Sequence, residues 1–291
     1  MLLIFEHFDK IFIYALWGYY MRKRIGLIIG EQDSDYCKEL VKVVTREAHK
    51  NDFDVFIFAN YGTYDHSVYL YGEGEISVYK IPDLDSFDGF ILDETLYNIE
   101  NMGEIVYSYF DKNATCPVIS LKKRTNRFYD ILVEDRQGIK SMTEHFIKKH
   151  GFTKICHMTG RWELQDARER YHGYEDAMME ADLDITNDMV FYGDYWKNKG
   201  AEAVEYFSKN GYPEAIVCAN DYMAISVCTE LAKRGIKVPE DICVSGFDDS
   251  EEGRCQNIPL TTVEDDIESF ALCAIRTLEK AIAGEDVVKE Q

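Results

Sequence analysis

Segment 213–249 constrains the fold more than any other part of the chain, because it alternates two buried strands with a helix. The apolar run 215–219 predicts a strand, a helix ending at Gly235 follows it, and 242–245 predicts a second strand. Strands that alternate with helices build parallel sheets. The segment therefore predicts an α/β fold.

Polar residues follow both of these strands directly. Asn220 and Asp221 come after the first strand, and Asp248 comes after the second. Ligands of open α/β sheets bind outside the carboxyl ends of the strands, and an amide both donates and accepts hydrogen bonds. We therefore expect a polar ligand at this edge. A helix cap is an equal alternative for Asp221, and a turn is the alternative for Asp248.

The same alternation fills the rest of the chain. A length of 291 residues exceeds the usual size of one core, so two lobes are predicted. A second series begins near residue 131, where Asp135 is expected to cap a helix that Gly151 ends. Segment 61–80 is rich in Tyr and Gly with little periodicity, and we expect it to be loop or edge structure. The expected strands of the first series are 24–29, 55–58, 89–92 and 117–121.

Short motifs at regular spacing accompany segment 213–249. They are VED at 133–135 followed by Gly138, GFTKI at 151–155, MTG at 158–160, ARER at 167–170 with GY at 173–174, and PLTTV at 259–263. This ordered set resembles the effector-binding domain of the lactose-repressor/purine-repressor family, which shares its fold with periplasmic sugar-binding proteins. The resemblance implies two doubly wound parallel-sheet lobes joined by a multi-strand hinge, the type I periplasmic-binding-protein-like fold.

The resemblance also implies how the chain is divided. The first lobe is expected to hold 22–125 and 258–284, and the second lobe 126–257, with crossovers at 122–129 and 249–258. Residues 1–21 are expected to be an extension outside the fold. Lobes joined in this way open and close about a hinge, so a small-molecule effector in the cleft would shift a two-state equilibrium. A homodimer is the expected assembly.

Arg170 matches the family arginine that lies three residues before a glycine and reaches the ligand. A guanidinium donates paired hydrogen bonds to neighbouring oxygens, so Arg170→Ala is expected to weaken binding with little loss of stability. The alternative is a surface arginine paired with Glu163, Asp166 or Glu169. The remaining candidates follow strands of the first lobe or carry aromatic rings that would stack on a ligand or pack in a core: Gln32, Asp33, Tyr36, Asp93, Trp162 and Trp196.

The sequence also departs from the family pattern. Ser120, Leu121 and Lys122 stand where the family commonly has an acidic residue, so the family's ligands do not transfer. We expect this chain to lack the family's helix-turn-helix, because only some twenty residues precede the first expected strand. After Gly284 the family continues into a further strand pair, so an output domain beyond Gln291 is one expectation.

The net charge of −21, from 32 basic and 53 acidic residues, opposes contact with phosphates. The two basic clusters, 22–24 and 122–127, are interpreted as a solvated flank and loop. We therefore expect no direct nucleic-acid binding by this chain alone.

The eight cysteines are dispersed without metal-ligand spacing, which predicts no metal site, no cofactor and a reducing cytoplasm. Neither a nucleotide-binding glycine motif nor a nucleophile–base set occurs among the motifs, so no catalysis is expected. The apolar run 11–20 is about half as long as a membrane span, which predicts no membrane segment. A true start at Met21 is preferred over a short amphipathic anchor.

These observations together predict a cytoplasmic sensor of repressor type that binds a sugar or nucleoside-like ligand between two lobes. Two alternatives stay open: an input module of a larger signalling protein such as a diguanylate cyclase, and a transport-type solute-binding protein.

Overall fold

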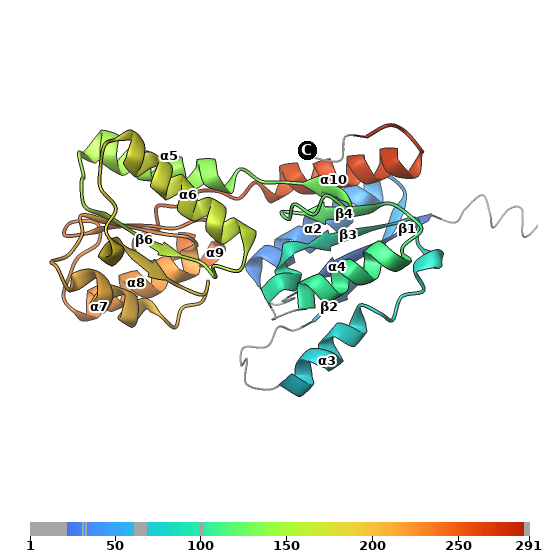
Figure 1. The fold of residues 1–291 in the computed structure, drawn as a ribbon, viewed down its shortest axis with the longest axis horizontal. Coiled ribbons are helices and arrows are strands. Elements are labelled where there is room, and N and C mark those ends of the chain that lie inside the picture. Colours follow the sequence, from blue (N-terminus) through green and yellow to red (C-terminus); the bar gives the residue numbers. More distant parts are fainter. Residues whose placement is uncertain (1–21, 31, 33, 61–68, 99–101, 288–291) are drawn as a thin grey trace, which may run out of the picture.

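The computed structural model describes residues 22–30, 32, 34–60, 69–98 and 102–287, which form two lobes along the long axis of the molecule (Figure 1). Each lobe has its own parallel sheet with helices on both faces. The predicted α/β class with two parallel sheets is confirmed. No helix within the described ranges has the length and apolar character that a membrane span requires.

The first lobe contains a five-stranded sheet in the order β2-β1-β3-β4-β5. Its helices α2 and α10 contact each other and share an apolar core with the sheet, while α4 belongs to a second core that includes Phe90 and Phe110. The strands are β1 (Lys23–Ile29), β2 (Phe53–Ala59), β3 (Gly89–Asp93), β4 (Val118–Leu121) and β5 (Tyr129–Ile131). The helices are α2 (Asp35–Lys50), α3 (Tyr69–Val78), α4 (Met102–Asn113) and α10 (Ile267–Ile282), with short 3-10 turns at Leu84–Ser86 and Glu94–Asn98.

The second lobe contains a four-stranded sheet in the order β7-β6-β8-β9. Helices α5 and α6 pack on each other, as do α7 and α8. The strands are β6 (Ile155–Thr159), β7 (Val190–Tyr192), β8 (Ala215–Cys218) and β9 (Cys243–Ser245). The helices are α5 (Asp135–His150), α6 (Gln165–Glu180), α7 (Gly200–Ser208), α8 (Asp221–Lys233) and α9 (Glu251–Arg254), with a 3-10 turn at Asn187–Met189.

Glycines end helices α5 and α8 and allow α5 and α6 to pack closely. Gly151 and Gly235 follow α5 and α8 with φ of 71° and 75°, a left-handed conformation that glycine adopts without strain. At Gly173 in α6, a Cβ atom would lie 2.1 Å from the carbonyl oxygen of Arg136 in α5. Only glycine therefore permits the close packing of α5 against α6.

The described chain passes between the lobes twice, at 132–134 and at 264–266 (Figure 1). Before the second passage it still pairs with the second lobe, because Thr261 bridges Ser245 and the Asp248 N–H donates to the carbonyl of Val263 at 2.8 Å. The two passages lie together and form the hinge.

Three expectations differ from the structure. Residues 129–131 were expected to belong to the second lobe, but they form β5, which pairs with β4 in the first sheet, so the first crossover follows Ile131 instead of lying at 122–129. The second crossover follows Val263 instead of occupying 249–258, because 259–263 is held by backbone hydrogen bonds to the end of β9. Helix α3 lies in a stretch expected to be loop or edge, where apolar residues do not gather on one helical face. The expectations for 1–21 and 61–68 lie outside the described residues.

Candidate ligand-binding cleft

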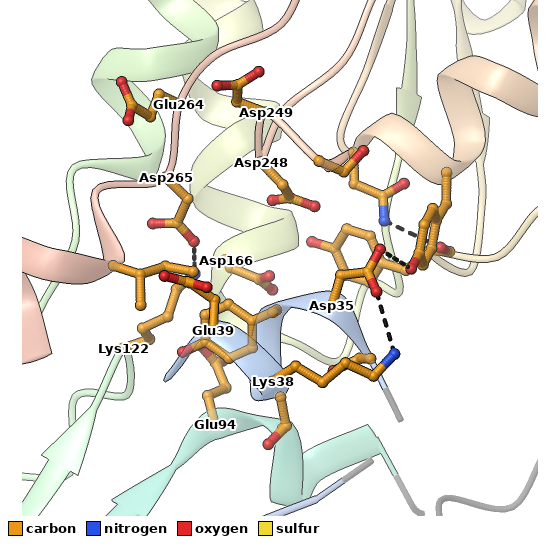
Figure 2. Close-up of a pocket in the computed structure, with 18 of the residues that line it drawn as sticks. Asp35, Lys38, Glu39, Glu94, Lys122, Asp166, Asp248, Asp249, Glu264 and Asp265 are labelled. Carbon is orange, nitrogen blue, oxygen red and sulfur yellow. Dashed lines mark hydrogen bonds and ion pairs between the residues drawn. The ribbon is translucent and has the colours of Figure 1, made fainter. Parts of the chain in front are cut away.

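A cleft of about 750 Å³ separates the two lobes, and residues from both lobes line it (Figure 2). Its first-lobe wall comes from the start of α2, the ends of β3 and β4, and the second crossover. Its second-lobe wall comes from α6, the loop after β7, and the segments that follow β8 and β9. The carboxyl ends of both parallel sheets therefore open into one space, where α/β folds bind ligands.

Tyr36 and Asp93 form a hydrogen-bonded pair in the first-lobe wall. The Tyr36 hydroxyl donates to Asp93 Oδ2 at 2.7 Å, and the backbone N–H and hydroxyl of Thr95 donate to Oδ1 at 3.0 and 2.6 Å. Burial raises the pKa of Asp93, and the hydrogen bonds from Thr95 and Tyr36 oppose that rise. Asp93 is thus held in one orientation before any ligand arrives.

Lys122 is buried beside this pair, whereas the sequence interpretation made it part of a solvated basic loop. Its side chain is 8% exposed, and its ammonium donates to Asp265 Oδ2 at 2.7 Å. The Nζ atom also lies 4.8 Å from the centre of the Tyr36 ring. Burial lowers the pKa of Lys122, but the charge of Asp265 and other carboxylates outweighs it and leaves the pKa raised. Lys122 is therefore a charged component of the cleft wall.

Arg170 lies in the second-lobe wall, where other groups of the protein hold its guanidinium. Its Nε and Nη2 atoms lie 2.8 Å from Asp135 Oδ1, and Nη1 donates to the Ala219 carbonyl at 2.6 Å. The guanidinium carbon lies 3.8 Å from the centre of the Phe247 ring. Arg170 is only 2% exposed, and its partner is Asp135, not one of the surface carboxylates considered from the sequence.

Two expectations about this pair therefore change. Asp135 does not cap α5, because Glu134 precedes the helix and the Asp135 carboxylate binds Arg170. Removing the arginine would leave a carboxylate that is 4% exposed without its cation. Loss of one partner of a buried pair destabilises strongly. The buried ion pair therefore predicts a large loss of stability for Arg170→Ala, in place of the small loss expected from the sequence.

Asp248 projects into the cleft next to Arg170. Its Oδ1 atom lies 3.5 Å from Nη1 of Arg170, and a third of its side chain is exposed. Its φ of 103° is rare for a residue with a side chain, and strained backbone of this kind clusters at binding sites. Burial raises the pKa of Asp248 to about 8, while the charge of Arg170 opposes the rise. We therefore expect Asp248 to change its charge near neutral pH, which the pH dependence of stability tests.

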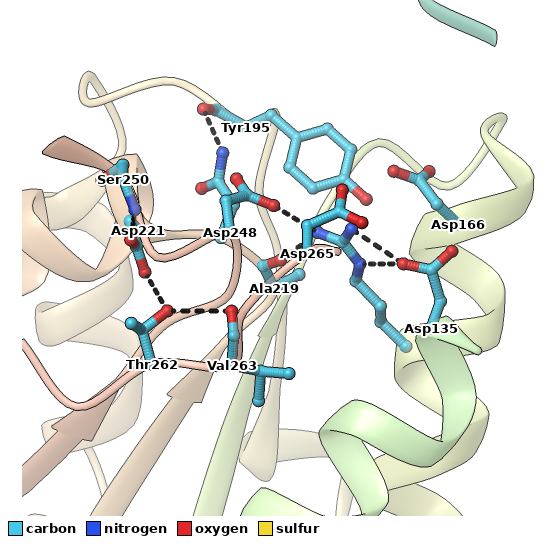
Figure 3. A network of polar contacts seen from close by, with 12 residues as sticks. Asp135, Asp166, Tyr195, Ala219, Asp221, Asp248, Ser250, Thr262, Val263 and Asp265 are labelled. Atoms are coloured by element: carbon cyan, nitrogen blue, oxygen red, sulfur yellow. Dashed lines mark hydrogen bonds and ion pairs between the residues drawn. The ribbon is translucent and has the colours of Figure 1, made fainter. Parts of the chain in front are cut away.

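Asn220 and Asp221 have separate roles. The side-chain oxygen Oδ1 of Asn220 caps α8 by accepting from the Met223 N–H at 3.0 Å. The side-chain Nδ2 of Asn220 donates to the backbone carbonyl of Tyr195 at 3.1 Å. Asn220 lines the cleft, but Asp221 does not. Asp221 instead accepts from the Ser250 N–H at 2.7 Å and from the Thr262 hydroxyl at 2.6 Å (Figure 3). The cap that the sequence offered to Asp221 thus belongs to Asn220.

The other sequence candidates divide between the cleft and its surroundings. Trp196 lines the cleft and stacks on Tyr222, with ring centres 6.2 Å apart. Trp162 is outside the lining, 39% exposed and edge-on to Tyr171. Gln32 is exposed and is not part of the lining. Asp33 lies outside the described residues.

Sequence reasoning missed Asp35, Gln165 and Tyr222, which connect the two walls, and offered Glu94 only as a polar residue at the end of a strand. The Tyr222 hydroxyl of the second lobe donates to Asp35 Oδ2 of the first lobe at 3.0 Å. The backbone N–H of Gln165 donates across the cleft to Glu94 Oε1 at 2.9 Å. The only sequence signal was position, because Asp35 and Gln165 each begin a helix and Glu94 directly follows Asp93 at the end of β3.

Known proteins share this architecture. Residues 143–291 match the family model of the periplasmic binding protein-like domain. The HTH-type transcriptional repressor PurR of Aliivibrio salmonicida is 25% identical over 250 residues, which cover 83% of this chain and 69% of that protein. Such relatives are transcriptional regulators and not enzymes.

Solved structures show the same fold. The transcription regulator CcpA of Lactococcus lactis matches with a TM-score of 0.74 and 21% identity, over 92% of this chain and 93% of CcpA. The lac repressor dimer bound to operator and the anti-inducer ONPF matches with a TM-score of 0.75 and 19% identity, over 96% and 93% of the two chains. The two lobes, the cleft between their strand ends and these matches lead to one assignment. This chain belongs to the periplasmic binding protein-like domain family, as an effector-binding domain of the lactose-repressor/purine-repressor type.

Proposed function

We propose that this chain is the sensor of a repressor-type regulator and binds a small polar ligand in the interlobe cleft. The observation that carries the proposal is the cleft of about 750 Å³, which polar groups at the strand ends of both lobes line. Its volume falls within the range of small-molecule sites. The proposal assigns ligand contacts to Asp248 and Asn220 of the second lobe and to Tyr36 and Asp93 of the first, and includes no chemical step.

Lobe movement provides the output in this proposal. The lobes meet through few polar contacts, such as those of Tyr222 with Asp35 and of Glu94 with Gln165, and they are joined at the hinge by two passages of the chain. A ligand that contacts both walls stabilises the closed arrangement more than the open one. The population of the closed arrangement then rises with ligand concentration.

We further propose that the protein works in the cytoplasm as a homodimer and does not itself bind nucleic acid. All eight cysteines are free, which fits a reducing compartment. The lac repressor that shares this fold is described as a dimer bound to operator. The net charge of −21 opposes contact of this chain with phosphates.

A thermal-shift screen of polar metabolites, followed by small-angle X-ray scattering with each hit, tests the sensor proposal. A ligand is expected to raise the melting temperature and to reduce the radius of gyration as the lobes close. Asp248→Ala and Asn220→Ala are expected to weaken binding of that ligand, whereas Gln32→Ala, outside the cleft lining, is the matched control. Binding that survives both cleft substitutions would show that the ligand occupies another place.

A further inference from the structure

The cleft carries an excess of negative charge. Thirteen of the residues that line it are Asp or Glu, and six are Lys or Arg. Each of these six cations already has a carboxylate within 4.0 Å. Of the other lining carboxylates, Asp194 and Glu268 pair with Lys199 and Arg46 from outside the lining, which still leaves acidic groups in excess. A cleft of this kind attracts cations and repels anions.

Glu94 shows the excess most clearly. It is 6% exposed, its Oε1 atom accepts from Gln165, and its Oε2 atom has no hydrogen-bond partner among the described residues. Burial raises the pKa of Glu94, and the charge of Asp166 on the opposite lobe raises it further. The carboxylates of Glu94 and Asp166 thus repel each other from opposite walls of the cleft, and the charge of Lys123 opposes the rise in the pKa of Glu94 without cancelling it.

Asp265, on the hinge side of the cleft, is a second buried carboxylate with one oxygen that lacks a hydrogen-bond partner among the described residues. It is also 6% exposed, and Lys122 occupies its Oδ2 atom. Its Oδ1 atom has no partner within the part of the chain that the structure describes. Figure 2 shows Glu94, Asp166 and Asp265 around the same part of the cleft. A buried acceptor without a donor is costly, and it indicates a group that is supplied from outside.

We infer, building on the proposed function, that the ligand of this cleft is a small organic cation, an amine that also carries hydroxyl groups, with its ammonium group between Glu94 and Asp166. An ammonium group donates to carboxylates of both lobes and cancels the repulsion that resists their approach. A hydroxyl group would satisfy an acceptor but would leave the charge in place. The described residues contain no group of three or more His, Cys, Asp or Glu side chains suited to a metal ion, which favours an organic cation.

Calorimetry with matched amine and alcohol probes tests this inference on the full chain. The pairs are 1-amino-1-deoxysorbitol with sorbitol, D-glucosamine with D-glucose, and putrescine with 1,4-butanediol. The amine of a pair is expected to bind about ten- to a hundredfold more tightly than its alcohol, because it makes charge-assisted contacts. Added salt is expected to weaken the binding of the amine and to leave the binding of the alcohol unchanged.

Glu94→Gln keeps the acceptor for Gln165 and removes the charge. It is expected to reduce the amine preference about tenfold, and Asp166→Asn is the second variant from the opposite wall. In the unliganded protein Glu94→Gln is also expected to raise the melting temperature. Glu205→Gln, at an exposed position in α7, is the matched control for both measurements.

The outcomes separate the two proposals. Alcohols that bind as tightly as their amines, or a preference that Glu94→Gln and Asp166→Asn leave unchanged, would overturn the cationic ligand and leave the sensor function standing. A fall in melting temperature for Glu94→Gln would likewise show that the Glu94 charge has a stabilising partner. Absence of binding by every amine and every alcohol would contradict both the ligand class and the assigned cleft.

Discussion

The two walls of the cleft differ in how completely their polar groups are satisfied. In the second lobe, Arg170 is held by Asp135 and a carbonyl, and Asn220 uses both ends of its amide within the protein. In the first-lobe wall, Glu94 and Asp265 each keep a buried carboxylate oxygen without a partner among the described residues, whereas the second-lobe wall keeps one neutral group of this kind, the Tyr195 hydroxyl. The family model matches 143–291, which includes most of the second lobe. The comparison indicates that the second-lobe wall is a frame whose charged groups are already held by the protein, and we expect the first-lobe wall to determine which ligand binds.

The largest expected effect on stability comes from removing Arg170 from the second-lobe wall. Arg170→Ala should reduce the free energy of unfolding by about 3–5 kcal/mol, because Asp135 would remain buried without its cation. Chemical denaturation measures this value. Arg136→Ala is the matched control, since Arg136 pairs with Asp176 between the same two helices at 2.7 and 2.8 Å but is half exposed. That variant should lose about 1 kcal/mol or less. Equal losses for the two variants would show that the second-lobe frame is not preformed.

A smaller effect is expected from the pH dependence of Asp248. Its environment contains Arg170, Asp265, Lys122 and Asp221, and burial raises its pKa to about 8. The folded state therefore holds a proton that the unfolded state releases near pH 4. The contribution of Asp248 to stability is present below pH 4 and is lost as the pH rises to about 8.

Melting temperatures between pH 5 and 8 measure this contribution. The wild-type protein should lose stability with rising pH in this range, and Asp248→Asn should flatten that part of the profile. Asp249→Asn, whose carboxylate instead pairs with the exposed Arg254, is the control. If Asp248→Asn leaves the profile unchanged, Asp248 is already ionised across this pH range. The second-lobe wall would then carry the negative charge of Asp248 at neutral pH.

The smallest effect is expected from Tyr36→Phe in the first-lobe wall. The substitution removes one hydrogen bond to Asp93 and leaves the two from Thr95 in place, so the free energy of unfolding should fall by about 1 kcal/mol. Thermal denaturation measures the change. Tyr171→Phe, whose hydroxyl makes only a 3.5 Å contact with Glu175, should change stability less. A loss as large as that for Arg170→Ala would show that the first wall is as rigidly built as the second.

Sequence reasoning predicted the elements that carry strong periodicity. The strands around Asn220 and Asp248 appear where the apolar runs placed them, and both residues line the cleft. Helix α3 was missed because its sequence has no apolar face. That Asn220 and Asp248 contact a ligand stays a prediction.

Long-range pairs could not be predicted from local patterns. Lys122 and Asp265 are 143 positions apart, so nothing near Lys122 in the sequence distinguishes a buried ion pair from a solvated loop. The same holds for Arg170 and Asp135, which lie 35 positions apart. Glu94 stood out only as a polar residue at a strand end, because its unpartnered oxygen depends on how the opposite lobe packs.

The contacts of Asp221 give the cleft a mechanical connection to the hinge. Asp221 directly follows the cleft residue Asn220, and its carboxylate fastens Ser250 and Thr262, the latter two positions before the second crossover. If a ligand displaces Asn220 as proposed, we expect the movement to pass through one peptide unit to Asp221 and then to the segment that leads into the other lobe. In this proposal, the start of α8 is the lever arm between the cleft and the hinge. The strength of the two hydrogen bonds that Asp221 accepts then sets how much of a ligand-induced displacement reaches the first lobe.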